Sequence, residues 1–152
     1  MENDAATVAR HAYKSIFTDY VSGAHNRAFL DLVLAAKYDS DADLGVVVFD
    51  VQIPQYRRVA DAVLRGVADS LRYVLPEVAR YGDNKFVAFL PECNGQLVDW
   101  AEVARFAVAL NPVFVDNQRI KPSVRVGSAK RRLFESIDSL VCRAEGTLNA
   151  KK

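Results

Sequence analysis

The stretch "VARYGDNKFVAFLP", residues 78–91, places two apolar runs around a short polar turn. Both runs contain β-branched and aromatic residues, which favour strands. Gly82, Asp83 and Asn84 lie between them and tolerate the positive φ angles of tight turns. The stretch therefore predicts a β-hairpin, and it leaves open whether the turn carries chemistry or only connects two strands.

Apolar periodicity predicts the remaining elements. Residues 44–51, "LGVVVFDV", are apolar without alternation, which is typical of a strand buried on both faces in the middle of a sheet. Asn26 is placed to cap the helix that follows it. A second hairpin is expected over 111–129, turning at Asp116 and Asn117. Apolar spacings of three and four residues predict helices over 4–17, 27–37, 57–75, 97–110 and 133–148.

The order of these elements defines the fold class. Two hairpins require antiparallel pairing, and the chain contains no repeat and no internal linker. The sequence therefore predicts an α+β domain with a mostly antiparallel central sheet flanked by helices, and it disfavours a doubly wound parallel sheet. A length of 152 residues with 51% hydrophobic content suits a single core.

Charge and hydropathy exclude several kinds of partner. Twenty Lys and Arg residues balance 19 Asp and Glu, so the net charge of +1 gives no global attraction to nucleic acid or to an anionic membrane. The basic segment "AKRRLF", 129–134, is interpreted as a solubilising helix start. No apolar run approaches the roughly 20 residues that span a bilayer, and the start "MEND" is unlike a signal peptide. We therefore expect a cytoplasmic protein.

Cysteine and histidine show no ligand spacing. Cys93 and Cys142 are far apart and are expected to be reduced thiols, with Cys142 in the core. His11 and His25 have neither a Cys nor another His nearby, so we expect surface or capping roles for them. A metal site built from Cys and His is not expected.

Four segments together resemble the GGDEF, or diguanylate cyclase, domain. "DYVSGAHNR" (19–27) is similar to the opening motif D-x-L-T-G-L-x-N-R, and "VVVFDV" (46–51) is similar to the strand that ends in a metal-binding Asp. "RYGDNKFVAFLP" (80–91) resembles R-x-G-G-D-E-F-x-x-x-L-P. "VRVGSA" (124–129) and "RAEGTLNAKK" (143–152) resemble the closing strand and helix. Four matches in order indicate the family more strongly than any one alone.

The resemblance implies a palm-like core akin to the nucleotidyl cyclases, with the 78–91 hairpin at the catalytic edge of the sheet. It divides the chain into an N-terminal amphipathic helix, 1–18, and a GGDEF-like domain, 19–152. Active members work as dimers in which each subunit holds one GTP and two divalent cations, and they join two GTP molecules into cyclic di-GMP. Carboxylates on neighbouring strands hold the two metals in this chemistry.

The chain departs from the family at most of the positions that do this chemistry. Asp50 matches the first metal ligand and is retained, whereas Gln52 stands where many members have a second Asp. The signature becomes Gly82-Asp83-Asn84-Lys85-Phe86. Within it Asp83 replaces the second Gly, Asn84 replaces the acidic metal and catalytic residue, and Lys85 replaces the acidic fourth residue. The set is a degenerate active site.

The nucleotide contacts of the family are also altered. Its guanine-reading Asn falls on Arg58, Asp61 aligns with a second guanine contact, and the segment before the helix is several residues shorter. Lys152 matches a lysine that touches phosphate. The inhibitory R-x-x-D product site falls on 73–76 and is absent.

Three hypotheses about function follow. The first is a catalytically inactive GGDEF-like domain that acts as a regulatory or protein-interaction module in cyclic di-GMP signalling and holds no Mg²⁺, because one carboxylate beside an ammonium group cannot hold two hard cations. Under this first hypothesis, Lys85 forms an ion pair with Asp50 and its ammonium group occupies the place of a metal. The alternative is that Lys85 points into water from the hairpin tip. The second is a vestigial nucleotide sensor, with GTP or a cyclic dinucleotide bound through Arg57, Arg58, Asp61, Lys85 and Lys152. The third is an active cyclase that recruits Asp83 as a second acid.

The expected partner is a protein. Residues 5–17 form an amphipathic stripe whose apolar face needs a partner, which is either a separate protein or a second copy in a homodimer. Nucleic acid and membranes are not expected partners.

Overall fold

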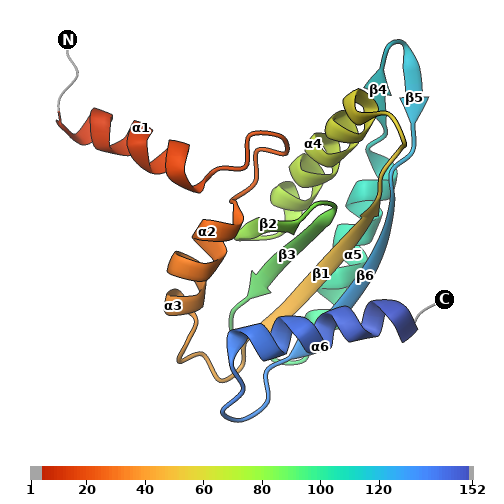
Figure 1. Ribbon diagram of the computed structural model, residues 1–152. Helices are drawn as coiled ribbons and strands as arrows, with labels where there is room; N and C mark the ends of the chain where they lie inside the picture. The colour runs from red at the N-terminus through yellow and green to blue at the C-terminus, as the bar shows by residue number, and fades with distance from the viewer. Residues whose placement is uncertain (1–4, 151–152) are drawn as a thin grey trace.

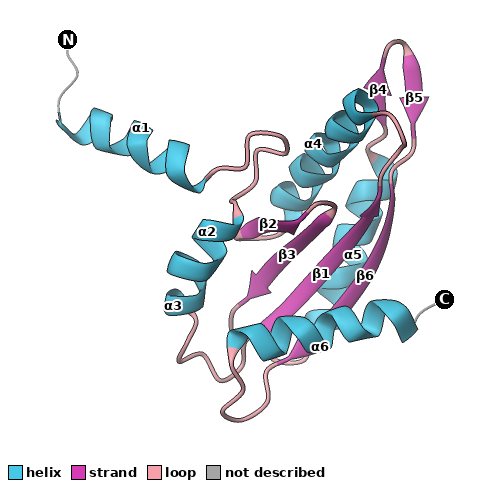
Figure 2. Ribbon diagram, viewed as in Figure 1, coloured by secondary structure: helices cyan, strands magenta, loops and turns pink. Residues whose placement is uncertain are grey.

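The computed structural model describes residues 5–150, apart from the side chains at positions 11, 13–15, 149 and 150. Helices and strands alternate along the chain much as the periodicity predicts (Figures 1 and 2). In chain order the elements are α1 (Ala5–Phe17), α2 (Arg27–Phe29), the π-helical turn η1 (Leu30–Leu34), α3 (Ala35–Lys37), β1 (Gly45–Gln52), α4 (Arg57–Val74), β2 (Val78–Gly82), β3 (Lys85–Leu90), α5 (Leu97–Leu110), β4 (Val113–Val115), β5 (Gln118–Ile120), β6 (Ser123–Lys130) and α6 (Ile137–Ala150).

The main sheet has the strand order β2-β3-β1-β6, and every neighbouring pair is antiparallel. The predicted hairpin is β2 and β3, and β1 lies at the centre between β3 and β6. The mostly antiparallel α+β fold expected from the sequence is therefore confirmed.

Helices cover both faces of the sheet, and each face has its own core. On one face α4 and α5 pack against side chains that include Val47, Phe49 and Val51 of β1. On the other face the alternate residues Val46 and Val48 pack against α6 and the 27–37 helical region. All five of these β1 side chains are fully buried. This explains the uninterrupted apolar run of β1, because a strand covered on both faces needs no polar side.

The 27–37 helix begins as predicted, because the Asn26 side chain accepts a hydrogen bond from the Phe29 backbone N–H at 3.0 Å. Before it, α1 projects away from the rest of the molecule (Figure 1) and meets it where the rings of Phe17 and Phe29 pack edge to face. His25 is half-buried and stacks on Phe29, with a centroid distance of 3.7 Å, so its role is packing rather than the expected capping or surface role.

The second predicted hairpin is only partly correct. Its turn is at Asp116 and Asn117, which both have positive φ angles, but the chain after it makes two strands instead of one. β5 ends at Ile120 and pairs with β4 alone, whereas β6 pairs with β1 in the main sheet. Pro122 lies between β5 and β6 and supplies no backbone N–H for a continuous ladder.

Helix α6 differs from its prediction at its start and at one cysteine. It begins at Ile137, so Leu133 and Phe134 lie in the preceding loop, where their side chains are 82% and 95% exposed. Cys142 is exposed and not in the core, and it is Cys93 that is buried. The residues of α6 that do face the sheet are Leu140, Ala144 and Leu148, which places Cys142 on a different side of the helix.

Gly127 of β6 sets how closely α6 packs on the sheet. A Cβ atom at this position would collide with the Ala144 carbonyl oxygen of α6. The Thr147 hydroxyl accepts a hydrogen bond from the Ser128 backbone N–H at 3.0 Å beside this contact. The absence of a side chain at Gly127 therefore lets the backbones of helix and strand come together.

No helix within residues 5–150 is long and apolar enough to cross a membrane.

Candidate functional site

The predicted site lies where three strands meet at one end of the sheet. Asp50 of β1 is paired in register with Lys85 of β3 on one side and with Arg125 of β6 on the other. Cross-strand partners point to the same face of a sheet, which here is the face that α6 covers. Three charged side chains are thereby brought side by side. A cavity of about 380 Å³ opens beside them, lined by Asp50, Val51, Gln52, Ile53, Asn84, Ser123 and Arg125.

Asp50 is bound on both of its carboxylate oxygens. The Asn84 side-chain amide donates hydrogen bonds of 2.8 Å to Asp50 Oδ1 and to the Val51 carbonyl. The Arg125 guanidinium forms an ion pair with Asp50 Oδ2. The Asp50 side chain is only 15% exposed, whereas that of Arg125 is 55% exposed and borders the cavity. An arginine and an amide therefore hold the one carboxylate retained from the family pattern.

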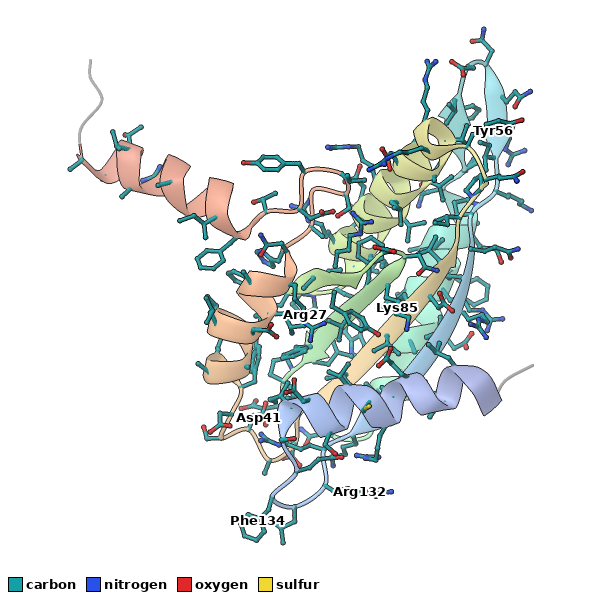
Figure 3. The ribbon with its side chains drawn as sticks, viewed as in Figure 1. Arg27, Asp41, Tyr56, Lys85, Arg132 and Phe134 are labelled. Carbon is teal, nitrogen blue, oxygen red and sulfur yellow. The ribbon has the colours of Figure 1, made fainter. Side chains whose placement is uncertain are left out.

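Lys85 does not pair with Asp50, so the predicted ion pair is wrong. Its ammonium group donates to Glu145 Oε2 of α6 at 3.0 Å, which also excludes the alternative of a side chain turned freely into water. Figure 3 shows Lys85 over the middle of the sheet, above α6 in that view. The choice of partner depends on tertiary contacts, because α6 places Glu145 beside Lys85 while β6 places Arg125 beside Asp50.

Tyr81 lies beside this cluster at the end of β2. Its hydroxyl is buried and has no hydrogen-bond partner of ordinary geometry among the described residues. Burial, with the Glu145 and Asp50 carboxylates nearby, raises the pKa of the Tyr81 hydroxyl far above its usual value. Tyr81 is therefore neutral at any physiological pH, and it packs against the core on the α6 face of the sheet.

A second ion pair joins two of the motifs that resemble the family. Arg80 Nη1 contacts Asp19 Oδ2 at 3.1 Å, and both side chains are about four-fifths buried. The other guanidinium nitrogens donate to the carbonyls of Gly82 and Asp83. Asp19 also accepts hydrogen bonds from the Ser22 backbone N–H at 2.9 Å and hydroxyl at 2.6 Å. The 19–27 turn and the tip of the hairpin are thereby tied together.

These contacts change the acidity of Asp19. Its burial opposes ionisation, but the hydrogen bonds from Ser22 and Arg80 outweigh burial and hold the pKa of Asp19 below its usual value. Asp19 is therefore a charged structural residue.

The remaining predicted residues do not converge on Asp50. Gln52 lines the cavity at the end of β1, and Asp83 is exposed in the turn. Arg58 forms an exposed ion pair of 2.8 Å with Asp116 at the tip of the β4–β5 hairpin. Asp61 lies on α4 and does not line the cavity. Lys152 is outside the described residues.

Comparison with solved structures identifies the fold. No protein-family model matches the sequence, and no curated protein matches it, but solved structures do. The diguanylate cyclase SiaD from Pseudomonas aeruginosa, solved in complex with its activator SiaC, has a TM-score of 0.80 and 21% identity over 95% of this chain. The coiled coil and GGDEF domain of DgcB from Caulobacter crescentus, in complex with cyclic di-GMP, has a TM-score of 0.77 and 22% identity.

The chain has the GGDEF fold. The match to DgcB covers 95% of this chain and 85% of that one, whereas the chain spans 61% of the SiaD chain. Vibrio cholerae LapD, bound to cyclic di-GMP, is similar over 36% of its chain with a TM-score of 0.76 and 17% identity. The recognition from four short motifs and the palm-like fold are thus confirmed.

The GGDEF fold raises the question of two metal ions, and the residues at Asp50 do not fit them. Each divalent cation needs several anionic oxygens, and one carboxylate is present where the strands meet. Its oxygens are taken by Asn84 and Arg125, and the nearby Glu145 is paired with Lys85. Within the described part of the chain, no three His, Cys, Asp or Glu side chains are grouped so that they could hold a metal ion.

Sequence reasoning missed the two residues that complete this cluster. Arg125 lies in the segment that resembles the closing strand but received no role in the site, and Glu145 received none either. The signal for Arg125 was its position two residues before the glycine of the closing-strand motif, since that strand is the neighbour of β1.

Proposed function

We propose that this chain is a GGDEF-like domain without diguanylate cyclase activity, acting as a regulatory or protein-interaction module in cytoplasmic cyclic di-GMP signalling. The ion pair between Arg125 and Asp50 carries the proposal. A fixed guanidinium neutralises the carboxylate that a metal would need, and it repels a cation that approaches the same oxygens. Without the metals, nothing at this edge activates an attacking hydroxyl or steadies a triphosphate.

The region that would read the nucleotide base supports the same proposal. The segment between β1 and α4 contains only residues 53–56, and the Arg58 guanidinium is paired with Asp116. The residue aligned with the guanine contact is thus held toward the β4–β5 hairpin by an opposite charge.

The regulatory part of the proposal rests on the neighbours in structure. SiaD was solved with an activator protein, and LapD was solved with cyclic di-GMP bound. A GGDEF fold that contacts other components of such a system can transmit a signal through docking alone. Its exposed apolar surfaces, which include Val8 and Ile16 of α1, are where a protein partner would contact this chain.

The test is incubation of the purified chain with radiolabelled GTP and either Mg²⁺ or Mn²⁺, followed by separation of the products. We expect no cyclic di-GMP, while SiaD with SiaC serves as the positive control. Product that disappears in an Asp50→Asn variant would show that the site is a working cyclase and would overturn the proposal.

A double variant tests whether Arg125 is what keeps a metal ion away from Asp50. Arg125→Ala frees Asp50 from its ion pair, and Asn84→Glu restores a second carboxylate. We expect the double variant to bind Mn²⁺ more tightly than the wild type in calorimetry, because it replaces one positive and one neutral group with a net negative charge. Equal Mn²⁺ affinity in both proteins would show that Arg125 does not exclude the metal.

Retained nucleotide binding is the second candidate. It is favoured by the cavity of about 380 Å³ at which the half-exposed Arg125 could meet a phosphate. Calorimetry with GTP and with cyclic di-GMP, each with and without Mg²⁺, distinguishes the two. The inactive interaction module predicts no binding up to millimolar ligand. Micromolar binding that Arg125→Ala abolishes would establish the sensor instead.

A further inference from the structure

Helix α5 has an apolar outer surface that the fold leaves uncovered. Its inner side buries Leu97, Ala101, Ala104 and Val108 in the core shared with α4 and the sheet. A surface helix ordinarily carries polar residues on the side opposite its core. In α5 that side carries large apolar residues instead. Their exposed fractions are 39% for Trp100, 46% for Val103, 63% for Phe106 and 75% for Leu110.

These four residues form one continuous strip, here named the α5 stripe. Their spacings of three and four residues place them along one side of the helix. From their exposed fractions and ordinary side-chain areas, the stripe presents on the order of 400 Å² of apolar surface. The largest apolar patch on an ordinary monomer is of about this size and is often functional.

The charges at the two ends of the α5 stripe are opposite. Asp99 and Glu102 are exposed beside its N-terminal end, and Glu102 also lies 3.8 Å from Arg105 on the next turn, so Asp99 is the main negative charge of this end. The β4–β5 hairpin follows its C-terminal end, and Arg119 and Lys121 are exposed there. A surface that is acidic at one end, apolar in the middle and basic at the other is complementary to a copy of itself turned end for end.

We propose that the chain forms a two-fold symmetric dimer in which the α5 stripes of two copies pack antiparallel. Val103 of each copy then lies near Phe106 of the other, and Trp100 lies near Leu110. The acidic end of each stripe meets the basic hairpin of the other copy. A stable interface buries roughly 800 Å² per partner, so the stripe supplies an apolar centre of about half that area and the charged ends supply the rim.

This surface is distinct from the catalytic edge and from α1. Helices α4 and α5 cover the face of the sheet opposite to α6, as Figures 1 and 2 show. The Asp50 side chain points to the α6 face, so the two copies in the dimer are back to back and their Asp50 clusters face outward. The inference does not depend on the proposed loss of activity, which is tested by product formation alone.

Light scattering after size exclusion tests the proposal on the full chain over a concentration series. We expect the wild type to reach twice the monomer mass of 16.9 kDa. Phe106→Asp should weaken the dimer at least tenfold, because it buries an unpaired carboxylate at the centre of the interface. The matched control is Phe134→Asp, which removes an even more exposed phenylalanine from the loop before α6 and should leave the dimer intact.

Charge reversal tests the antiparallel arrangement. Asp99→Lys and Lys121→Glu should each weaken the dimer, and combining them should restore most of it, because the exchanged charges again face each other across the two-fold axis. Circular dichroism must show that each variant is folded. A monomer at every concentration would overturn the proposal, as would a dimer that survives Phe106→Asp and disappears when residues 1–18 are removed.

Discussion

Asp19 and Asp50 each form an ion pair with an arginine, yet the two pairs differ in what surrounds them. Asp19 pairs with Arg80, both side chains are about four-fifths buried, and the arginine also holds two carbonyls of the hairpin tip. Asp50 pairs with Arg125, whose side chain is more than half exposed. The first pair connects distant parts of the chain, and the second neutralises a side chain at the edge of the sheet. The comparison shows that Asp19 has a structural role, whereas Asp50 is a neutralised carboxylate at the edge of the sheet.

The largest expected effect is at the first pair. Arg80→Ala removes the ion pair to Asp19 and the hydrogen bonds to the hairpin carbonyls, so we expect it to lower the free energy of unfolding by about 3 kcal/mol. Denaturation in urea measures this. The control is Arg58→Ala, whose ion pair to Asp116 is exposed on both sides and should contribute less than about 1 kcal/mol. Equal losses for the two variants would remove the distinction between buried and exposed pairs.

The next largest effect is expected from acid, which should weaken the ion pair between Asp19 and Arg80. The pKa of Asp19 is lowered in the folded state, so its contribution is complete above its unfolded value of 3.8 and is lost as the pH falls through the folded value. Asp19→Asn should therefore be less stable than wild type at pH 7 and show a shallower loss of stability below about pH 4. Thermal unfolding over a pH series measures the slope.

Glu135 is a second residue that makes the stability of the fold fall in acid, so it limits the effect of Asp19→Asn on the slope of stability against pH. Hydrogen bonds from Arg143 outweigh burial and lower the pKa of Glu135 from 4.5 to about 2, so this residue adds its own acid sensitivity in the same range. Asp19→Asn should thus reduce the acid limb without abolishing it. An unchanged slope would mean that Asp19 titrates alike in the folded and unfolded chain.

A smaller effect is expected at the second pair. In Asp50→Ala, Arg125 can return to water and Asn84 keeps its hydrogen bond to the Val51 carbonyl, so the loss should stay below about 1 kcal/mol. The same urea experiment measures it. A loss as large as that of Arg80→Ala would show that Asp50 has become a structural residue like Asp19.

The smallest expected effect is that of Mg²⁺. A ligand that binds only the folded protein raises its melting temperature, and Asp50 held by Arg125 offers no site for such binding. We expect about 10 mM Mg²⁺ to change the melting temperature no more than a sodium salt of equal ionic strength does. A specific rise that Asp50→Asn removes would contradict the proposed loss of the metal site.

The sequence predicted the fold well because its strongest signals are local. The unbroken apolar run of β1 requires cover on both faces, and the turn residues Asp83 and Asn84 stand between two clear strands. The split at Pro122 was missed because alternation continues across it from Ile120 to Val124, and only the sheet shows that the partner strand changes. Cys142 was misplaced because its apolar character says nothing about which side of α6 it occupies.

The candidate site was less predictable because its contacts cross the sheet. Asp50 and Asn84 were recognised from their places in the motifs, but the choice of a cationic partner depends on register and on α6. Lys85 and Arg125 both stand opposite Asp50, and no local pattern says which one binds it. The answer required the position of Glu145, which is 60 residues from Lys85 in sequence.

That position of Glu145 follows from Gly127. The missing side chain at Gly127 allows α6 to rest on β6 at Ala144, one residue before the carboxylate that holds Lys85. A side chain at Gly127 would lift the helix and withdraw this carboxylate, and Lys85 would then compete with Arg125 for Asp50. A glycine outside the cavity therefore influences which of two cations neutralises Asp50, so the electrostatic character of this edge can change without any substitution in residues 82–86.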